Sequence, residues 1–145
     1  MTDGDVVEFG TGMFSTPVLH WMCVPDKRKL VSYESNIKFY EIARQYSDEF
    51  HDVLFVSNFD NLDIEKPWDV VFIDHQADRR RIEARRVSNC AQFVILHDTC
   101  GRDEKYFQYK DIYPLYKYKY QFNLIRPKTS VLSNFVDVSK LNLWS

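Results

Sequence analysis

Short apolar runs alternate with segments of helical spacing through the first two thirds of the chain. Five such runs, each leading into polar residues, lie at positions 6–9, 30–34, 53–56, 68–73 and 93–96. Continuous apolar runs of this length are typical of strands that are buried on both faces of a parallel sheet. The pattern predicts an α/β fold with a doubly wound, mostly parallel sheet and right-handed connections.

Three segments between or after these runs have apolar residues at helical spacing, at positions 17–23, 36–46 and 78–89. The last segment contains five arginines, which are Arg79, Arg80, Arg81, Arg85 and Arg86. Its apolar face is sparse, with Ile82 and Val87 as its main members. This composition predicts a helix that is largely exposed to solvent.

The last third of the chain differs, because tyrosines alternate there with lysines. The aromatic positions are Tyr113, Tyr116, Tyr118, Tyr120 and Phe122. Alternation predicts two strands, over 113–122 and 129–136, that finish the sheet as an antiparallel hairpin. Stacked rings and cations would also suit a platform for single-stranded nucleic acid, but this period is more typical of a half-buried strand.

Polar residues that follow the apolar runs are the candidates for ligand binding, because ligands bind outside the carboxyl ends of parallel strands. They are Glu8 to Gly12, Glu34, Asn58, Asp74 with His75, and Asp98 with Thr99. After the first run, two glycines precede Ser15 and Thr16, which predicts a strand, a tight turn and the start of a helix. Glycine permits close approach of a ligand, and free amides at a helix N-terminus favour anionic groups.

The composition is that of an ordinary globular domain. The chain has 145 residues, 45% of them apolar, and its net charge of -2 provides no general attraction to nucleic acid or anionic membranes. Cys23, Cys90 and Cys100 have no metal-type spacing, so we expect reduced thiols. No apolar stretch approaches the roughly twenty residues of a membrane span, and the N-terminus lacks a signal-peptide pattern. We therefore expect one soluble, cytoplasmic domain without a membrane partner.

The glycine turn and the acid that ends the second run resemble class I S-adenosylmethionine-dependent methyltransferases, over nearly the whole chain. VEFGTG is similar to that family's acidic-x-Gly-x-Gly loop, and Glu34 in VSYESN stands where a second acid binds both ribose hydroxyls. The resemblance implies S-adenosylmethionine as cofactor and a Rossmann-like sheet with strand order 3-2-1-4-5-7-6. The cofactor contacts it implies are Glu8, Gly10, Gly12, Ser15, Thr16 and Glu34, with Asn58, Phe59 and His75 near adenine.

DVVFIDHQADR and FVILHDT are similar to the catechol-type O-methyltransferases, in which the acids that end strands four and five hold a divalent cation. Asp74 and Asp98 occupy those positions, so the resemblance implies Mg²⁺ ligands and catalytic roles for both. The chain departs from that branch at Thr99, where the branch has asparagine, and at Ala77, where it has a lysine base. Both departures argue against a metal site of that kind.

Histidines at the same strand ends are the alternative general bases, because imidazole titrates near neutral pH. His97 precedes Asp98, and His75 follows Asp74. Packing beside adenine or a hydrogen bond to a loop is the commoner role of such histidines. Asp98 likewise suits a turn that closes its strand.

Members of the family usually carry helices before the first strand, whereas here that strand begins about five residues from the start. We therefore expect one minimal domain over residues 1–145, without N-terminal lid helices. The segment 101–119 would then cover the site, with Tyr106, Phe107 and Tyr109 to line it. Substrate contacts from a second chain, in a homo-oligomer or with a partner subunit, fit the same expectation.

Two functions from different classes fit these residues. The first is methyl transfer from S-adenosylmethionine to a hydroxyl or amine of a small molecule. The second is a subunit that binds the cofactor without catalysis and completes or regulates a partner. A nicotinamide-dependent oxidoreductase shares the glycine turn and the ribose acid but fits the glycine spacing less well. Modification of nucleic acid would depend on the arginine-rich segment, for which a solvated helix face is the commoner explanation.

Overall fold

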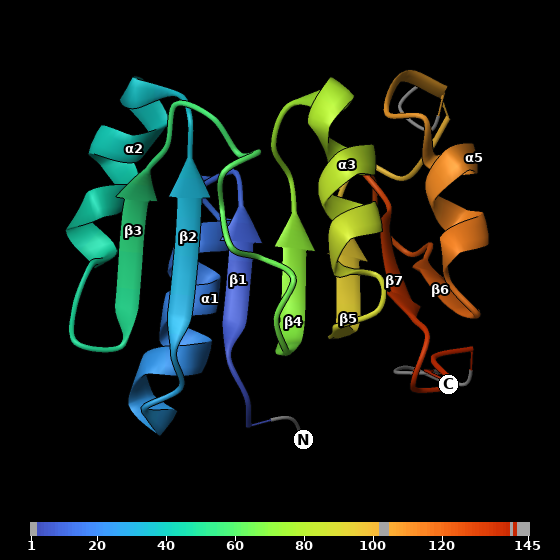
Figure 1. The fold of residues 1–145 in the computed structure, drawn as a ribbon, viewed down its shortest axis with the longest axis horizontal. Coiled ribbons are helices and arrows are strands. Elements are labelled where there is room, and N and C mark those ends of the chain that lie inside the picture. The colour runs from blue at the N-terminus through green and yellow to red at the C-terminus, as the bar shows by residue number, and fades with distance from the viewer. Residues whose placement is uncertain (1–2, 102–104, 140, 142–145) are drawn as a thin grey trace.

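A computed structural model describes residues 3–101, 105–139 and 141. They form one seven-stranded sheet with helices on both sides (Figure 1). The strands are β1 (Val6–Phe9), β2 (Leu30–Glu34), β3 (His51–Phe55), β4 (Trp68–Ile73), β5 (Ala91–Leu96), β6 (Tyr118–Phe122) and β7 (Thr129–Ser133). The helices are α1 (Ser15–Cys23), α2 (Ile37–Ala43), α3 (Ala77–Val87) and α5 (Tyr109–Ile112), with 3₁₀ turns η1 (Val24–Asp26), η2 (Arg44–Tyr46) and η3 (Tyr113–Leu115).

The strand order is β3-β2-β1-β4-β5-β7-β6. Strands β1 to β5 pair in parallel, whereas β7 pairs antiparallel with both β5 and β6. The predicted α/β fold, its strand order and its antiparallel C-terminal hairpin are therefore confirmed. The carboxyl ends of β1, β2, β4 and β5 lie at one edge of the sheet, as parallel pairing requires (Figure 1).

Burial of the central strands follows from their unbroken apolar sequence. All four residues of β1 are buried, and its neighbour β4 contributes Val71 and Ile73 to the same core. In Figure 1, α3 and α5 lie on the near face of the sheet, while α1 lies behind β1 and β2. Tyr109 and Ile112 of α5 are fully buried against this core. None of the helices in the described ranges is long and apolar enough to cross a membrane.

The aromatic C-terminal part forms a half-buried strand, as alternation predicts, but a shorter one. Residues 113–115 form η3, which has a proline in its first turn, so β6 begins only at Tyr118. Every residue of β6 except Lys119 is half-buried. The ammonium of Lys119 lies 3.9 Å from the ring centre of Tyr113, so the tyrosine and lysine side chains contact each other.

The prediction of a largely exposed helix over 78–89 was wrong. α3 buries Arg80, Glu83, Ala84 and Val87, and only three of its eleven residues are exposed. Charged side chains can be buried when they are paired and hydrogen-bonded, and the buried Arg80 and Glu83 pair with Asp74 and His75, which lie outside α3. The spacing of charges along one helix could not indicate those partners.

Candidate functional site

The turn after β1 reaches the carboxyl edge of the sheet and requires glycine at its first position. Gly10 has a φ of +89°, and a Cβ there would lie 2.7 Å from backbone atoms of His75. The backbone after β1 therefore passes directly against the backbone after β4. Gly10 N donates to Tyr33 O at 2.9 Å, which also ties the turn to β2.

Glu8 and Thr16 support this turn from beneath. The N–H of Gly12 donates to Thr16 Oγ1 at 3.0 Å, and that hydroxyl donates to the Glu8 carboxyl at 3.0 Å. Both Glu8 and Thr16 are fully buried. Neither lines the cavities described below, so the structure places these two predicted cofactor contacts one layer behind the ligand-accessible surface.

Glu8 also begins a buried polar chain under the sheet edge. Ser32 Oγ donates to Glu8 Oε2 at 2.6 Å and lies 2.9 Å from His51 Nε2, while His51 Nδ1 lies 3.1 Å from His20 Nδ1. Burial raises the pKa of Glu8 to about 7, and neighbouring hydroxyls lower it only in part. Burial, together with the neighbouring His20, lowers the pKa of His51 to about 4. Glu8 therefore titrates near neutral pH while His51 stays neutral.

Glu34 ends β2 and accepts four hydrogen bonds from the adjacent chain. One oxygen accepts from the N–H and hydroxyl of Thr11, at 2.8 and 2.9 Å. The other accepts from the N–H groups of Ser35 and Asn36, at 2.8 and 2.6 Å. A carboxylate has about four acceptor positions, so Glu34 uses all of them here. The Thr11 hydroxyl is the one donor of the four that can rotate away.

A cavity of about 480 Å³ opens in front of Gly10 and Gly12, and we call it the glycine-turn cavity. The predicted residues Glu34 and His75 also line it, as does Asp74. Thr11, within the predicted range Glu8 to Gly12, lines it too, and the further lining residues absent from the sequence prediction are Ser35, Asn36, Phe39, Gln76 and Ala77. Their signal was adjacency alone, because each stands within five residues of a polar strand end. Cavities of this size are typical of small-molecule sites.

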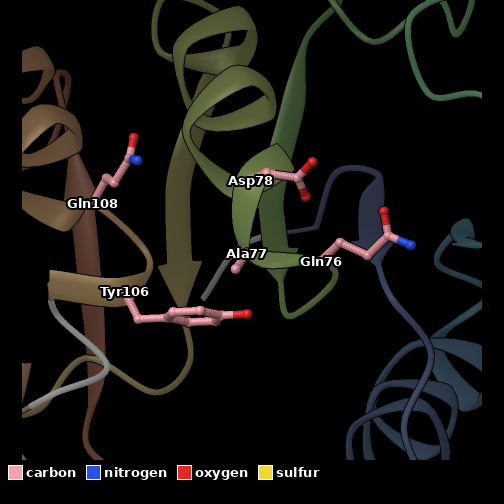
Figure 2. Close-up of a pocket in the computed structure, with 5 residues that line it drawn as sticks. All are labelled: Gln76, Ala77, Asp78, Tyr106 and Gln108. Carbon is pink, nitrogen blue, oxygen red and sulfur yellow. The ribbon is translucent and has the colours of Figure 1, made fainter.

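Tyr106 and Phe107 close the glycine-turn cavity from the segment after β5. A second hollow of about 430 Å³ adjoins it over the start of α3, and shares Gln76, Ala77 and Tyr106 with it. Figure 2 shows the ring of Tyr106 extending toward the first turn of α3. Two of the three aromatic residues expected to line the site therefore do so. The third, Tyr109, is fully buried beneath them.

Two of the three predicted adenine contacts lie elsewhere. Phe59 is buried, with its ring centre 4.9 Å from that of His75. Burial of an aromatic ring in the core is more favourable in free energy than its exposure at the sheet edge. Asn58 closes a local turn by accepting from the N–H of Asp60 at 2.9 Å. His75 lines the cavity, but its side chain is only 2% exposed and its Nε2 lies 2.8 Å from Glu83. Its backbone is thus the part that faces a ligand.

Asp74 and Asp98, the predicted metal ligands, face a cation that belongs to the chain itself. Arg80 Nη2 lies 2.8 Å from Asp74 Oδ1 and 3.8 Å from Asp98 Oδ2. Within the described ranges, no group of three or more His, Cys, Asp or Glu side chains could hold a metal ion. The predicted Mg²⁺ site therefore has no support. Burial raises the pKa of Asp74, although the nearby Arg80 and His97 act in the opposite direction.

His97 lies between the end of β5 and the start of β7. Its Nδ1 is 3.2 Å from Thr129 Oγ1, and its Nε2 is 3.4 Å from Asp98 Oδ1. About a third of its side chain is exposed. Asp98 has a φ of +57°, a left-handed conformation just after β5 that aspartate tolerates better than most residues.

A larger apolar groove of about 830 Å³ lies between α1 and the face of the sheet behind β4 and β5. Its walls are mostly apolar and include Met13, Phe14, Val18, Leu19, Met22, Val70, Phe72, Ile95 and Ile125. Its polar residues at the carboxyl edge of the sheet include Asp74, His97 and Thr129. Gly12 and Asp74 line both the apolar groove and the glycine-turn cavity, so the two spaces meet at this pair.

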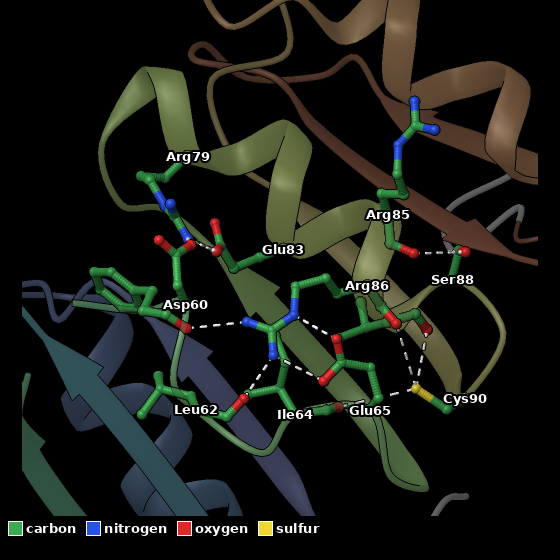
Figure 3. Close-up of polar contacts among 12 residues, drawn as sticks. Asp60, Leu62, Ile64, Glu65, Arg79, Glu83, Arg85, Arg86, Ser88 and Cys90 are labelled. Carbon is green, nitrogen blue, oxygen red and sulfur yellow. Dashed lines mark hydrogen bonds and ion pairs between the residues drawn. The ribbon is translucent and has the colours of Figure 1, made fainter.

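Two further arginines of α3, Arg79 and Arg86, hold the segment between β3 and β4. Arg79 lies 2.7 Å from Asp60 and 2.6 Å from Glu83. Arg86 pairs with Glu65 and donates to the carbonyls of Phe59 and Leu62 (Figure 3). These contacts remove Arg79, Arg80 and Arg86 from any surface that could attract phosphates. Arg81 and Arg85 remain exposed.

No family model matches the sequence, and no curated protein matches it. Solved structures nevertheless share its fold. A methyltransferase from Pyrococcus furiosus is 16% identical with a TM-score of 0.61, and the match covers 94% of this chain and 78% of that one. A Staphylococcus aureus protein assigned as a caffeoyl-CoA O-methyltransferase is 15% identical with a TM-score of 0.66, covering 88% and 74%. A ribosomal protein L11 methylase from Lactobacillus delbrueckii subsp. bulgaricus is 10% identical with a TM-score of 0.65, covering 94% and 72%.

The chain therefore has the fold of methyltransferases of the Rossmann-like class, as its resemblance to that family implied. Identities of 10 to 16% establish the fold and leave substrate and residue roles to the site itself.

Proposed function

We propose that this protein is an S-adenosylmethionine-dependent methyltransferase that acts on a hydroxyl or amine of a small molecule. The observation that carries the proposal is the meeting of two spaces at Gly12 and Asp74. A polar cavity beside the glycine turn suits the cofactor, and an apolar groove suits an acceptor. Group transfer between two bound molecules needs such a junction, because most of its acceleration comes from proximity and orientation.

The glycine-turn cavity would hold the cofactor through the residues that surround Glu34. The cofactor, when bound, supplies a methyl group on a positively charged sulfur. Rotation of the Thr11 hydroxyl would free one acceptor position on Glu34 for the ribose, while three backbone N–H groups keep the carboxylate in place. Phe39, Tyr106 and Phe107 provide aromatic walls for the adenine ring, in place of the predicted Asn58 and Phe59.

Asp74 is the side chain best placed to hold the acceptor. Its Oδ1 is engaged by Arg80, and none of the described side chains forms a hydrogen bond or ion pair with its Oδ2. Burial raises its pKa, so it can accept a proton from an acceptor hydroxyl more readily than an exposed aspartate can. His97 lines the same end of the groove and is the second candidate for that role.

Calorimetry with S-adenosylmethionine tests the cofactor assignment directly. We expect saturable binding by the wild type, weakened binding by Glu34→Ala, and unchanged binding by the control Glu49→Ala, because Glu49 is exposed and far from β2's end in sequence. Absence of binding by the wild type, or equal binding by Glu34→Ala, would refute the assignment.

Turnover is tested separately, with labelled cofactor and a panel of apolar acceptors that carry one hydroxyl or amine. Asp74→Asn should retain cofactor binding and lose transfer, because the amide cannot accept the proton. Cofactor binding without transfer to any acceptor would instead favour the non-catalytic subunit.

A further inference from the structure

One buried guanidinium joins the ends of β4 and β5. The side chain of Arg80 is 4% exposed. Its partners are His75 O at 2.8 Å from Nε, His97 O at 2.9 Å and Tyr109 Oη at 2.8 Å from Nη1, and Asp74 Oδ1 at 2.8 Å from Nη2. Asp98 Oδ2 lies slightly farther from Nη2, at 3.8 Å. Arginine presents its donors in a rigid planar fork, and here the fork contacts both strand ends at once.

The face of the same guanidinium is covered by Phe107, whose ring centre lies 3.8 Å from Cζ. Such stacking stabilises a cation and keeps water away from it. Phe107 also lines the glycine-turn cavity. The cation is thus enclosed between two carboxylates, two backbone carbonyls and an aromatic ring.

This arrangement conflicts with a divalent ion between the same carboxylates. A hard cation needs six or more oxygen ligands around it, and Arg80 Nη2 already occupies the approach to both aspartates. A second positive charge there would be repelled by the guanidinium at short range. The donors that the resemblance to catechol-type enzymes assigns to Mg²⁺ therefore do not fit that ion in this chain.

We propose that Arg80 is the resident cation of this site. It takes the position between Asp74 and Asp98 that a divalent ion would otherwise take. It also holds Asp74 by Oδ1, on a residue that lines both the glycine-turn cavity and the apolar groove, and leaves Oδ2 without a hydrogen bond from the described side chains. Arg80 acts through Asp74 and is a positioning residue. The consequence for methyl transfer depends on the function proposed above, whereas the replacement of the ion by Arg80 does not.

Manganese titration of the wild type is the first test, followed by electron paramagnetic resonance of free Mn²⁺ and by thermal unfolding. We expect no stoichiometric binding and the same unfolding midpoint in Mn²⁺ and in EDTA. Stoichiometric binding that Asp74→Asn abolishes would overturn the proposal. The measurement needs no cofactor, so its outcome is independent of whether the protein binds S-adenosylmethionine.

Removal of the guanidinium is the second test. Arg80→Ala should lower the unfolding midpoint by roughly 10 °C in EDTA, because it leaves two carboxylates without their cation. Mn²⁺ should restore part of that loss, and Arg80→Ala combined with Asp98→Asn should not respond to Mn²⁺. A midpoint for Arg80→Ala that is insensitive to Mn²⁺, in a folded protein, would contradict the replacement.

Arg85→Ala is the matched control, since Arg85 is an exposed arginine on the same helix, and it should behave as wild type with and without Mn²⁺. Arg80→Lys keeps the charge without the fork and is the variant to use if Arg80→Ala does not fold. It should remain insensitive to Mn²⁺ but, if the protein proves to transfer methyl groups, lower kcat more than it raises the KM for the cofactor. Stoichiometric Mn²⁺ binding by Arg80→Lys would count against the proposal.

Discussion

Two carboxylates at the same edge of the sheet are stabilised in opposite ways. Glu34, at the end of β2, accepts four hydrogen bonds from neutral donors, three of them backbone N–H groups. Asp74, just after the end of β4, pairs with the guanidinium of Arg80. The donors to Glu34 come from its own turn and the adjacent one, whereas Arg80 reaches Asp74 from α3 and simultaneously contacts β5 and α5.

The difference separates two tasks. Neutral donors fix Glu34 and leave its charge uncompensated, so it remains a strong acceptor for hydroxyl groups of a ligand. Arg80 compensates the charge of Asp74 and leaves one carboxylate oxygen for a molecule in the apolar groove. Under the proposed function, the β1–β2 half would therefore bind the cofactor and the β4–β5 half would orient the acceptor.

Arg80→Ala should lower the free energy of unfolding by about 3–5 kcal/mol, because a buried ion pair loses one partner. Denaturation in urea measures the loss, and Arg85→Ala should stay within about 0.5 kcal/mol of wild type. A small loss of unfolding free energy for Arg80→Ala would mean that water stabilises the charge of Asp74 as well as the guanidinium does. Asp74 would then not differ from Glu34 in depending on a charged partner.

Glu8 gives the β1–β2 half a pH dependence of known sign. Its pKa is raised from 4.5 to about 7, so folding favours the protonated form, and the stability from this group is lost as pH rises from about 4.5 to about 7. As pH rises through that interval, the free energy of unfolding of Glu8→Gln should therefore increase by about 3 kcal/mol relative to that of the wild type. Unfolding free energies at several pH values measure the gain, and Glu49→Gln is the exposed control.

The contribution of His51 to stability depends on pH in the opposite direction to that of Glu8. It can be measured in Glu8→Gln, in which Glu8 no longer titrates. Its pKa is lowered to about 4, so its contribution to stability is present above its ordinary value of 6.5 and is lost as pH falls toward 4. In the wild type, the two groups change the free energy of unfolding in opposite directions between about pH 4.5 and 6.5. Glu8→Gln should consequently become less stable on acidification, and a flat profile would disprove the opposition.

Glu34→Ala should cost only about 1–2 kcal/mol of stability, since its partners lie beside a cavity and can turn to water. Cofactor affinity should fall much further, by roughly tenfold to a hundredfold, through the loss of the charge-assisted hydrogen bond that the freed acceptor position makes to the ribose. Chemical denaturation and calorimetry on one preparation measure both quantities. A loss of stability as large as that of Arg80→Ala would show that Glu34 is primarily structural.

Thr11→Val should lower the free energy of unfolding by at most about 1 kcal/mol, because it removes one of the four hydrogen bonds to Glu34. Cofactor affinity should stay within a few fold of wild type, since the hydroxyl must leave Glu34 before the ribose binds. Calorimetry would contradict this if Thr11→Val lost affinity as severely as Glu34→Ala.

Much of the site's position was predictable, because parallel strands deliver their carboxyl ends to one edge. Gly10, Gly12, Glu34, Asp74 and His75 all line one cavity, as polar residues at strand ends should. The partners of those residues were not predictable. Whether a carboxylate faces a metal, a guanidinium or backbone N–H groups depends on side chains that are distant along the chain.

α3 illustrates the limit most clearly. Five arginines with few apolar neighbours indicate a solvated helix, and a periodicity argument has no access to acids on other segments. Asp60, Glu65 and Asp74 provide those acids in the folded chain. Phe59 shows the same limit of sequence-based prediction for an aromatic residue. Its position after β3 suggested a contact with a ligand, but its large apolar side chain is buried in the core.

Local sequence patterns were enough to predict the α/β class and the edge at which the polar residues meet, and the family resemblance added the strand order. Apolar runs and glycine turns are local features, and local features specify strands and their ends. Only the tertiary structure decided that Arg80 stands between Asp74 and Asp98, that Glu8 is buried beneath the glycine turn, and that two cavities meet at Asp74. These facts depend on contacts between side chains far apart in sequence, whose geometry exists only once the sheet and its helices are packed.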